Sequence, residues 1–230
     1  MVKAVFLDAI DTIFEAYPDK VGMYCRAIKK VSGLVITRDQ MSLVWNKIVT
    51  DTEDVAAREM SEDGTLAWEG FNQRIIELLD YKGDIVKVGN ALLYEAWSNP
   101  DNFVLFDDVI PALEMLKDKG VKIYCASNEN KRLSNFFVHF SIDSYFTDIF
   151  TSEALGVEKP NPAFFEKILV ATGFDKNEVL HVGDSIVSDY DGAQNVGIRA
   201  ILVDRNDEIK ENRNIVRIND LCDIKSFLEV

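Results

Sequence analysis

The sequence has few cysteines and too little positive charge to balance its acidic residues. Its three cysteines, Cys25, Cys125 and Cys222, are widely spaced and form no Cys-x-x-Cys pair. This spacing predicts neither a disulfide framework nor a zinc site. Lysine and arginine together number 25 against 39 aspartates and glutamates, which gives a formal net charge of -14. We therefore expect no nucleic-acid or anionic-membrane partner, because such partners need a basic face.

The sequence also lacks an uncharged apolar run long enough to span a bilayer. The apolar stretch at its start contains Asp8 and Asp11 and has no cleavage pattern, so it is not typical of a signal peptide. We expect a cytoplasmic protein. With 230 residues, 47% of them hydrophobic, the chain is long enough to bury the core of one large domain or of two modest ones.

The clearest positive feature is a predicted strand that ends on a carboxylate. The residues from Val2 to Leu7 are apolar apart from Lys3, which is typical of a buried parallel strand, and Asp8 follows directly. In open α/β sheets, ligands bind beyond the carboxyl ends of the strands. Asp8 therefore lies where chemistry is expected, although a single aspartate at this place could equally cap a turn.

The middle of the chain differs from its two ends. From about Tyr17 to Asn99 the apolar residues recur at helical spacing, which predicts a bundle of four helices with short connections. After Pro100, strand and helix patterns alternate, which is typical of a doubly wound parallel α/β sheet. We predict a Rossmann-like catalytic core over residues 1-15 and 100-230, and an inserted α-helical cap domain over residues 16-99.

Three further predicted strand ends in this core carry polar side chains. These are Ser127 with Asn128, then Lys159, and then Asp184 with Asp189. Asp8 and Asp184 could supply two oxygen ligands to Mg²⁺. Ser127 and the amide of Asn128 could hold a phosphate oxygen at a helix N-terminus, and Lys159 could screen the repulsion between Asp8 and a phosphate. Any one of these residues is weak support for a site, but four strand ends in this order indicate one.

The four strand ends give the chain its resemblance to a known family. Aspartate after the first strand, Ser127-Asn128, Lys159-Pro160 and Gly183-Asp184-Ser185 resemble, in order and spacing, the four motifs of the haloacid dehalogenase (HAD) superfamily. Within it, the chain is similar to the subfamily whose helical cap follows the first motif. The resemblance implies a hydrolase with a HAD-type core, and the cap-bearing phosphatases are the most similar group.

The resemblance also implies a role for each residue. Asp8 would be the nucleophile that forms an aspartyl-phosphate, and Lys159 would assist it. Thr12, Ser127 and Asn128 would bind a small phosphorylated substrate. Asp8, the backbone carbonyl of Ile10, Asp184 and Asp189 would form the Mg²⁺ site, with Asp189 either a ligand or a residue that orients the ligands.

One position departs from the phosphatase pattern. Two residues after the nucleophile, where the family has an acid-base aspartate, the sequence has Ile10. Asp11 then stands where glycine is usual, and its side chain is expected to point elsewhere. Losing a placed general acid-base lowers a rate by roughly 10²–10⁴. Three readings stay open: a phosphatase with unusual acid-base chemistry, a dehalogenase-type hydrolase, or an impaired protein that still binds phosphorylated ligands.

Overall fold

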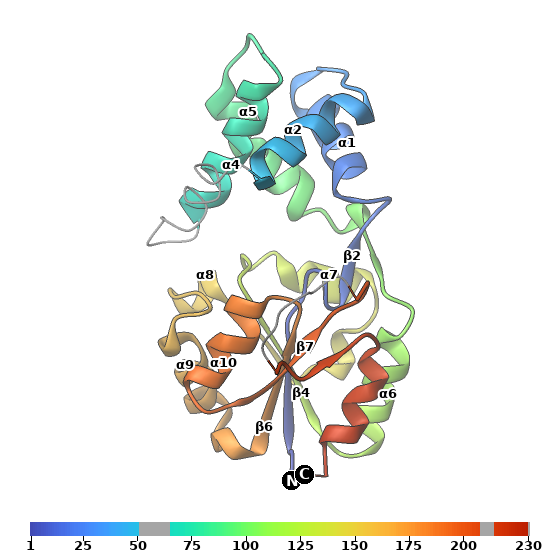
Figure 1. Cartoon of the computed structure of the whole chain (residues 1–230), viewed down its shortest axis with the longest axis vertical. Helices are drawn as coiled ribbons and strands as arrows, with labels where there is room; N and C mark the ends of the chain where they lie inside the picture. The colour runs from blue at the N-terminus through green and yellow to red at the C-terminus, as the bar shows by residue number, and fades with distance from the viewer. Residues whose placement is uncertain (51–64, 208–213, 230) are drawn as a thin grey trace. The chain divides into compact units, whose positions relative to one another are not determined.

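The computed structural model describes residues 1–50, 65–207 and 214–229. The chain divides into two compact units (Figure 1). The first is formed by Met1–Glu15 together with Leu105–Val230, and the second by Ala16–Val104. The helical segment predicted over 16–99 falls within the second unit. In the described ranges, no helix combines the length and the apolar character that crossing a membrane requires.

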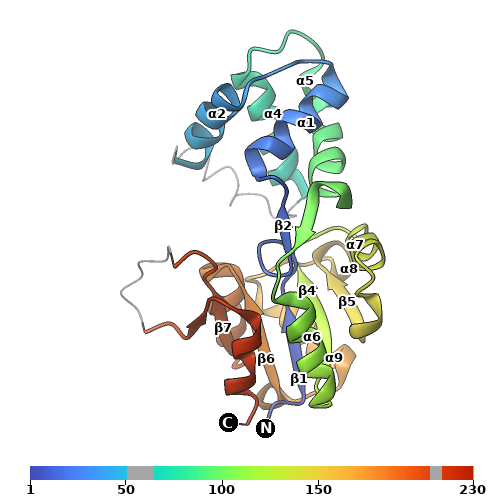
Figure 2. The ribbon, with the colours of Figure 1, turned by 90° about the vertical axis from the view of Figure 1, so that its right-hand side faces the viewer.

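The first unit, called the core unit below, is built on a six-stranded sheet in the order β5-β4-β1-β6-β7-β8, and every pairing in it is parallel. Figure 2 shows the strands side by side, with β5 toward one edge and β7 toward the other. The predicted doubly wound parallel sheet is confirmed. The strands are β1 (Ala4–Leu7), β4 (Lys122–Ser127), β5 (Asp148–Thr151), β6 (Val179–Gly183), β7 (Arg199–Val203) and β8 (Arg217–Ile218).

The register of the central strands brings their carboxyl ends to one level. Leu7, the last residue of β1, lies opposite Cys125 of β4 and Val182 of β6. Asp8 comes one residue beyond this level, and Ser127 and Asp184 come two residues beyond it. The sheet therefore presents three of the predicted site residues at the same edge.

Helices cover both faces of the sheet (Figure 1). On one face, α9 and α10 supply Phe164, Phe165 and Ala193 to a buried cluster with alternate strand residues such as Phe6, whose ring meets Tyr124 edge to face at 5.7 Å. Helix α6 and the terminal 3₁₀ helix η6 lie on the other face. The helices are α6 (Val109–Asp118), α7 (Leu133–His139), α8 (Ser152–Leu155), α9 (Pro162–Thr172), α10 (Gly192–Asn195), the 3₁₀ helices η3 (Asp143–Tyr145), η4 (Lys176–Glu178) and η6 (Leu221–Phe227), and the π-helix η5 (Ile186–Asp191).

The second unit, called the helical unit below, packs its helices around a hydrogen-bonded tyrosine. The Tyr24 hydroxyl donates to Asn72 Oδ1 at 2.7 Å and accepts from the indole N–H of Trp97 at 2.7 Å. Both tyrosine and asparagine are fully buried. Buried hydroxyl and amide groups need such partners, so this contact fixes three helices to one another. The helices are α1 (Lys20–Ser32), α2 (Arg38–Thr50), α4 (Thr65–Leu78), α5 (Ile85–Leu92) and the π-helix η1 (Leu93–Trp97).

The chain passes from one unit to the other twice, and the two segments that do so pair with each other as strands. β2 (Phe14–Ala16) and β3 (Phe103–Leu105) form a separate two-stranded sheet, and the 3₁₀ helix η2 (Pro100–Asn102) precedes β3. The sequence pattern did not predict this sheet, because three-residue strands give no periodicity to detect.

Candidate active site

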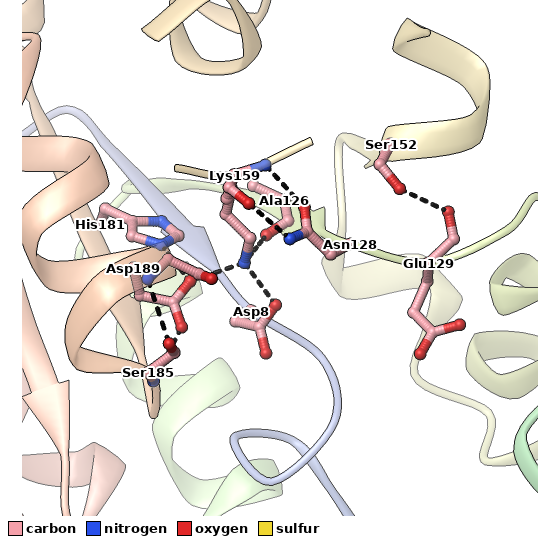
Figure 3. Close-up of polar contacts among 10 residues, drawn as sticks. Asp8, Ala126, Asn128, Glu129, Ser152, Lys159, His181, Ser185 and Asp189 are labelled. Carbon is pink, nitrogen blue, oxygen red and sulfur yellow. Dashed lines mark hydrogen bonds and ion pairs between the residues drawn. The ribbon is translucent and has the colours of Figure 1, made fainter. Parts of the chain in front are cut away.

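Lys159 is the centre of a buried ionic network at the strand ends. Its ammonium donates to Asp8 Oδ1 at 2.6 Å, to Asp189 Oδ1 at 2.6 Å and to the carbonyl of Ala126 at 2.9 Å (Figure 3). All three residues with charged groups are almost inaccessible, with exposures of 7% for Asp8, 3% for Lys159 and 1% for Asp189. Burial opposes the charge on Lys159, but the two carboxylates outweigh it and raise its pKa, so the amine stays charged.

Asp189 is held by three donors from different parts of the chain. Besides Lys159, His181 Nε2 lies 2.8 Å from Asp189 Oδ1, and the N–H of Ser185 donates to Oδ2 at 3.0 Å. Burial would raise the pKa of Asp189, but Lys159 and His181 outweigh it and hold the pKa below its usual range. A Cβ atom on Gly183 would collide with this carboxylate, so the glycine of the motif makes room for Asp189.

Asp184 completes an acidic cluster with Asp8 and Asp189. One ligand oxygen from each of the three lies within 4.8 Å of the others. Burial raises the pKa of Asp184 well above its usual value, and the charges of Asp8 and Asp189 raise it further. Burial also raises the pKa of Asp8. Crowded carboxylates at a buried place suit a hard divalent cation, which prefers oxygen ligands and would relieve their repulsion.

Two of the predicted phosphate-binding residues contact the network: Ser127 meets Asp8, and Asn128 meets Lys159. Ser127 is buried, and its hydroxyl hydrogen-bonds to Asp8. The side chain of Asn128 clamps the Lys159 backbone, donating to its carbonyl at 2.8 Å and accepting from its N–H at 2.7 Å. Thr12 is fully buried, and its hydroxyl is one of the buried atoms without a hydrogen-bond partner in the described part of the chain. The clamp fixes the Lys159 loop to the end of β4.

The loop after β1 contains the two residues that depart from the expected pattern. Ile10 is half-buried, and its backbone forms an isolated β-bridge with Phe14. Asp11 takes a positive φ of 61°, a conformation that suits the glycine usual at this place. The direction of the Asp11 side chain stays a prediction. Its charge is a minor contributor to the raised pKa of Asp184, after burial and the charges of Asp8 and Asp189.

Sequence reasoning missed three residues around the site. His181 lies inside an apolar strand, Arg205 is remote in sequence, and Glu129 follows the Ser127-Asn128 pair. Arg205 donates to the Thr12 carbonyl at 2.6 Å, and its guanidinium lies 4.1 Å from the centre of the Phe106 ring. Only Glu129 had a usable signal, an ionisable side chain next to a predicted phosphate-binding pair.

Comparison with known proteins shows the family to which the chain belongs. Residues 2–197 match the family model of the haloacid dehalogenase-like hydrolases. The chain belongs to this family, which confirms the resemblance seen in the motifs and identifies the protein as a hydrolase.

Relatives and solved structures agree with this assignment. The chain is 28% identical over 225 residues to haloacid dehalogenase-like hydrolase domain-containing protein 3 of Danio rerio, covering 93% of this chain and 90% of the relative. It is 24% identical to the glyceraldehyde 3-phosphate phosphatase of Methanothermobacter thermautotrophicus, over 99% of this chain and 100% of that protein. The HAD-hydrolase YfnB of Bacillus subtilis, solved bound to magnesium, shares the fold with a TM-score of 0.83 at 18% identity, covering 100% and 99% of the two chains.

Proposed function

We propose that the protein is a Mg²⁺-dependent phosphohydrolase that acts on a small phosphorylated metabolite through an aspartyl-phosphate on Asp8. The observation that carries this proposal is the charged Lys159, which donates to Asp8 at 2.6 Å, in a site where the carboxylates of Asp8, Asp184 and Asp189 are crowded together. A nucleophilic carboxylate and a phosphate repel each other, and Lys159 together with a cation bound by the carboxylates would supply the positive charge they need. Phosphatases among the relatives favour phosphate over a carbon–halogen substrate.

The roles of the residues follow from their positions. Asp8 attacks phosphorus, and Lys159 contacts both Asp8 and the transferring group. The Ser127 hydroxyl, the N–H of Asn128 and the hydroxyl of Thr12 hold the phosphate oxygens. The unpartnered Thr12 hydroxyl supports its role, because a buried donor without a partner is costly unless a ligand binds it.

The metal would be held by Asp8, Asp184 and the carbonyl of Ile10. Bound Mg²⁺ would neutralise charge on the phosphate and the carboxylates. Asp189 was predicted as a metal residue, and we assign it the orienting role, because Lys159, His181 and Ser185 already occupy its oxygens. The action of the helical unit as a cap stays a prediction.

The test is a hydrolysis screen with Mg²⁺ across aryl, acyl, sugar and nucleotide phosphates. We expect phosphate release that disappears on chelation and in Asp8→Asn. Mass spectrometry of the acid-quenched protein should find a phosphoryl group on the Asp8 peptide. Hydrolysis that persists in Asp8→Asn would overturn the proposal.

A second candidate is a protein that binds phosphorylated ligands without turning them over. Ile10 favours it, because isoleucine cannot exchange a proton with the leaving oxygen or with water. Phosphate binding by the wild type with no hydrolysis of any substrate in the screen would support this candidate. A dehalogenase is less favoured, because carbon–halogen cleavage needs no metal and the acidic cluster would serve no purpose.

A further inference from the structure

Arg205 connects the loop after the nucleophile to two other segments of the core unit. It follows β7, which ends at Val203, and its Nη2 donates to the Thr12 carbonyl at 2.6 Å. Its Nη1 pairs with Asp108, the residue before α6, and the guanidinium lies 4.1 Å from the centre of the Phe106 ring. The side chains of Arg205 and Asp108 are only 15% and 10% exposed. A charged donor shielded from water in this way binds a carbonyl more firmly than an exposed one does.

The guanidinium is turned so that it serves the loop as well as its ion pair. Arginine and aspartate commonly pair through two parallel hydrogen bonds that use both carboxylate oxygens. Here Nη1 donates to Asp108 Oδ2, and the same oxygen accepts from the Leu221 N–H at 2.6 Å. Within the described ranges, Asp108 Oδ1 and Arg205 Nε have no hydrogen-bond partner. The second bond of the usual pair is therefore missing, and Nη2 binds the Thr12 carbonyl instead.

The loop is held both from within and from outside. The Ala9 carbonyl accepts from the Ile13 N–H at 2.7 Å, which closes the loop on itself. The Ile13 carbonyl accepts from the Phe106 N–H at 3.3 Å, and the Thr12 carbonyl accepts from Arg205. Two successive carbonyls are thus bound by groups that lie outside the loop, so the backbone at Thr12 is fixed.

The placement of the Thr12 side chain depends on this backbone. Thr12 is fully buried, and its hydroxyl is without a hydrogen-bond partner in the part of the chain that the structure describes. Rotation about the first side-chain bond of threonine is restricted, so the backbone largely decides where the hydroxyl lies. A hydrogen bond weakens steeply when its angle falls below about 120°. The hydroxyl can therefore bind a phosphate oxygen well only if the backbone holds it at the right angle.

We propose that Arg205 is a positioning residue, which fixes the Thr12 peptide so that the Thr12 hydroxyl meets the phosphate; this inference rests on the proposed phosphohydrolase function. The effect of Arg205 on the reaction passes through Thr12. Phe106 and Asp108 in turn hold the guanidinium in place.

The experiment is a double-mutant cycle between Arg205→Met and Thr12→Val. It is measured as kcat/KM for para-nitrophenyl phosphate and as the affinity for inorganic phosphate. Methionine keeps an apolar stem without the donors, and valine keeps the shape of threonine without the hydroxyl. Each single variant should lower both quantities by about 10–10²-fold. In the Thr12→Val background, Arg205→Met should lower them by less than about threefold further, because the hydroxyl that it positions is already gone.

Arg199→Met is the matched control. Arg199 is half-buried like Arg205, and its guanidinium also donates to a backbone carbonyl, that of Phe227 at 3.2 Å. It is the first residue of β7 and so lies at the end of the strand away from the site. Its loss should leave kcat/KM and phosphate affinity unchanged per folded molecule, with unfolding curves recording any change in stability.

Arg205→Lys provides a rescue and a second route through the cycle. Lysine keeps the positive charge and one donor group, but it lacks the fork that reaches Asp108 and Thr12 together. This variant should lose less kcat/KM and less phosphate affinity than Arg205→Met. It replaces the methionine variant in the cycle if that variant does not fold.

The outcomes separate the positioning role from the function beneath it. If Arg205→Met still lowers both quantities by about tenfold in the Thr12→Val background, the positioning role is overturned and the phosphohydrolase stays intact. A loss of stability alone, with both quantities at the wild-type level per folded molecule, overturns it too. Hydrolysis that survives in Asp8→Asn would overturn the phosphohydrolase, and the cycle on phosphate affinity would still decide the role of Arg205. A wild type that neither hydrolyses the ester nor binds phosphate would overturn both.

Discussion

The two units bury polar groups in opposite ways. The core unit buries charges, with Lys159 between Asp8 and Asp189 and with Asp184 nearby. The helical unit buries neutral groups, in the chain from Trp97 through Tyr24 to Asn72. Neutral hydrogen bonds contribute about 1 kcal/mol each to folding, whereas buried charges lose several kcal/mol of hydration before they attract one another. The comparison sets the charged groups to which we assign a chemical role against the neutral groups that join helices.

The largest expected effect tests the chemical side of this contrast. Asp8→Asn should lower phosphatase activity by about 10⁶-fold, as expected when a nucleophile is removed. Its thermal unfolding should stay within a few degrees of wild type, because Lys159 keeps Asp189 and the Ala126 carbonyl as partners. Kinetic measurements check the loss of activity, and calorimetry checks the thermal unfolding. A large fall in stability would mean that Asp8 serves the fold as well as the chemistry.

Lys159→Met should lower both the phosphatase activity and the free energy of unfolding. It leaves Asp8 and Asp189 buried without their cation, which typically destabilises by about 3–5 kcal/mol. Denaturant unfolding measures this change. The double variant with Asp8→Asn should regain part of the lost stability, because one unpaired charge is removed. A single variant as stable as wild type would contradict the assignment of Lys159 as the central cation.

The effect of Asp184→Asn on the unfolding temperature should reverse when Mg²⁺ is added. Without Mg²⁺ the variant should unfold at a higher temperature than wild type, because a half-buried carboxylate repelled by Asp8 and Asp189 is gone. With Mg²⁺ the order should reverse, and calorimetry should show an affinity weaker by about tenfold. Equal Mg²⁺ affinity in both proteins would remove Asp184 from the proposed metal site.

The smallest effect belongs to the neutral network. Tyr24→Phe leaves Asn72 Oδ1 and the Trp97 indole N–H without their shared partner, so we expect a loss of about 1–3 kcal/mol in unfolding free energy. Activity per folded molecule should stay at the wild-type level. A selective loss of kcat with unchanged stability would show that this network also serves the chemistry, and the contrast between the units would fail.

The sequence predicted the sheet and the convergence of the site residues because both depend on local patterns. Apolar runs define parallel strands, and their shared register brings Asp8, Ser127 and Asp184 to one edge. The side-chain partners did not follow from such patterns. Arg205 meets Thr12 across 193 residues, and His181 contacts Asp189 on a π-helix that periodicity does not predict. Asp189 was placed near the metal, but its three donors depend on side-chain directions that only packing decides.

The hydrogen bond from the Val2 N–H to the Leu228 carbonyl, at 3.1 Å, brings the two ends of this chain together. A short linker could therefore join them, and new ends could be opened at the boundaries between the units. Cutting between Glu15 and Ala16 and between Val104 and Leu105 would turn the core unit, now interrupted in sequence, into one continuous polypeptide that starts at Leu105 and ends at Glu15. Joining the ends and cutting at both boundaries would let two separate genes encode the two units, so that each could be expressed and tested for folding by itself.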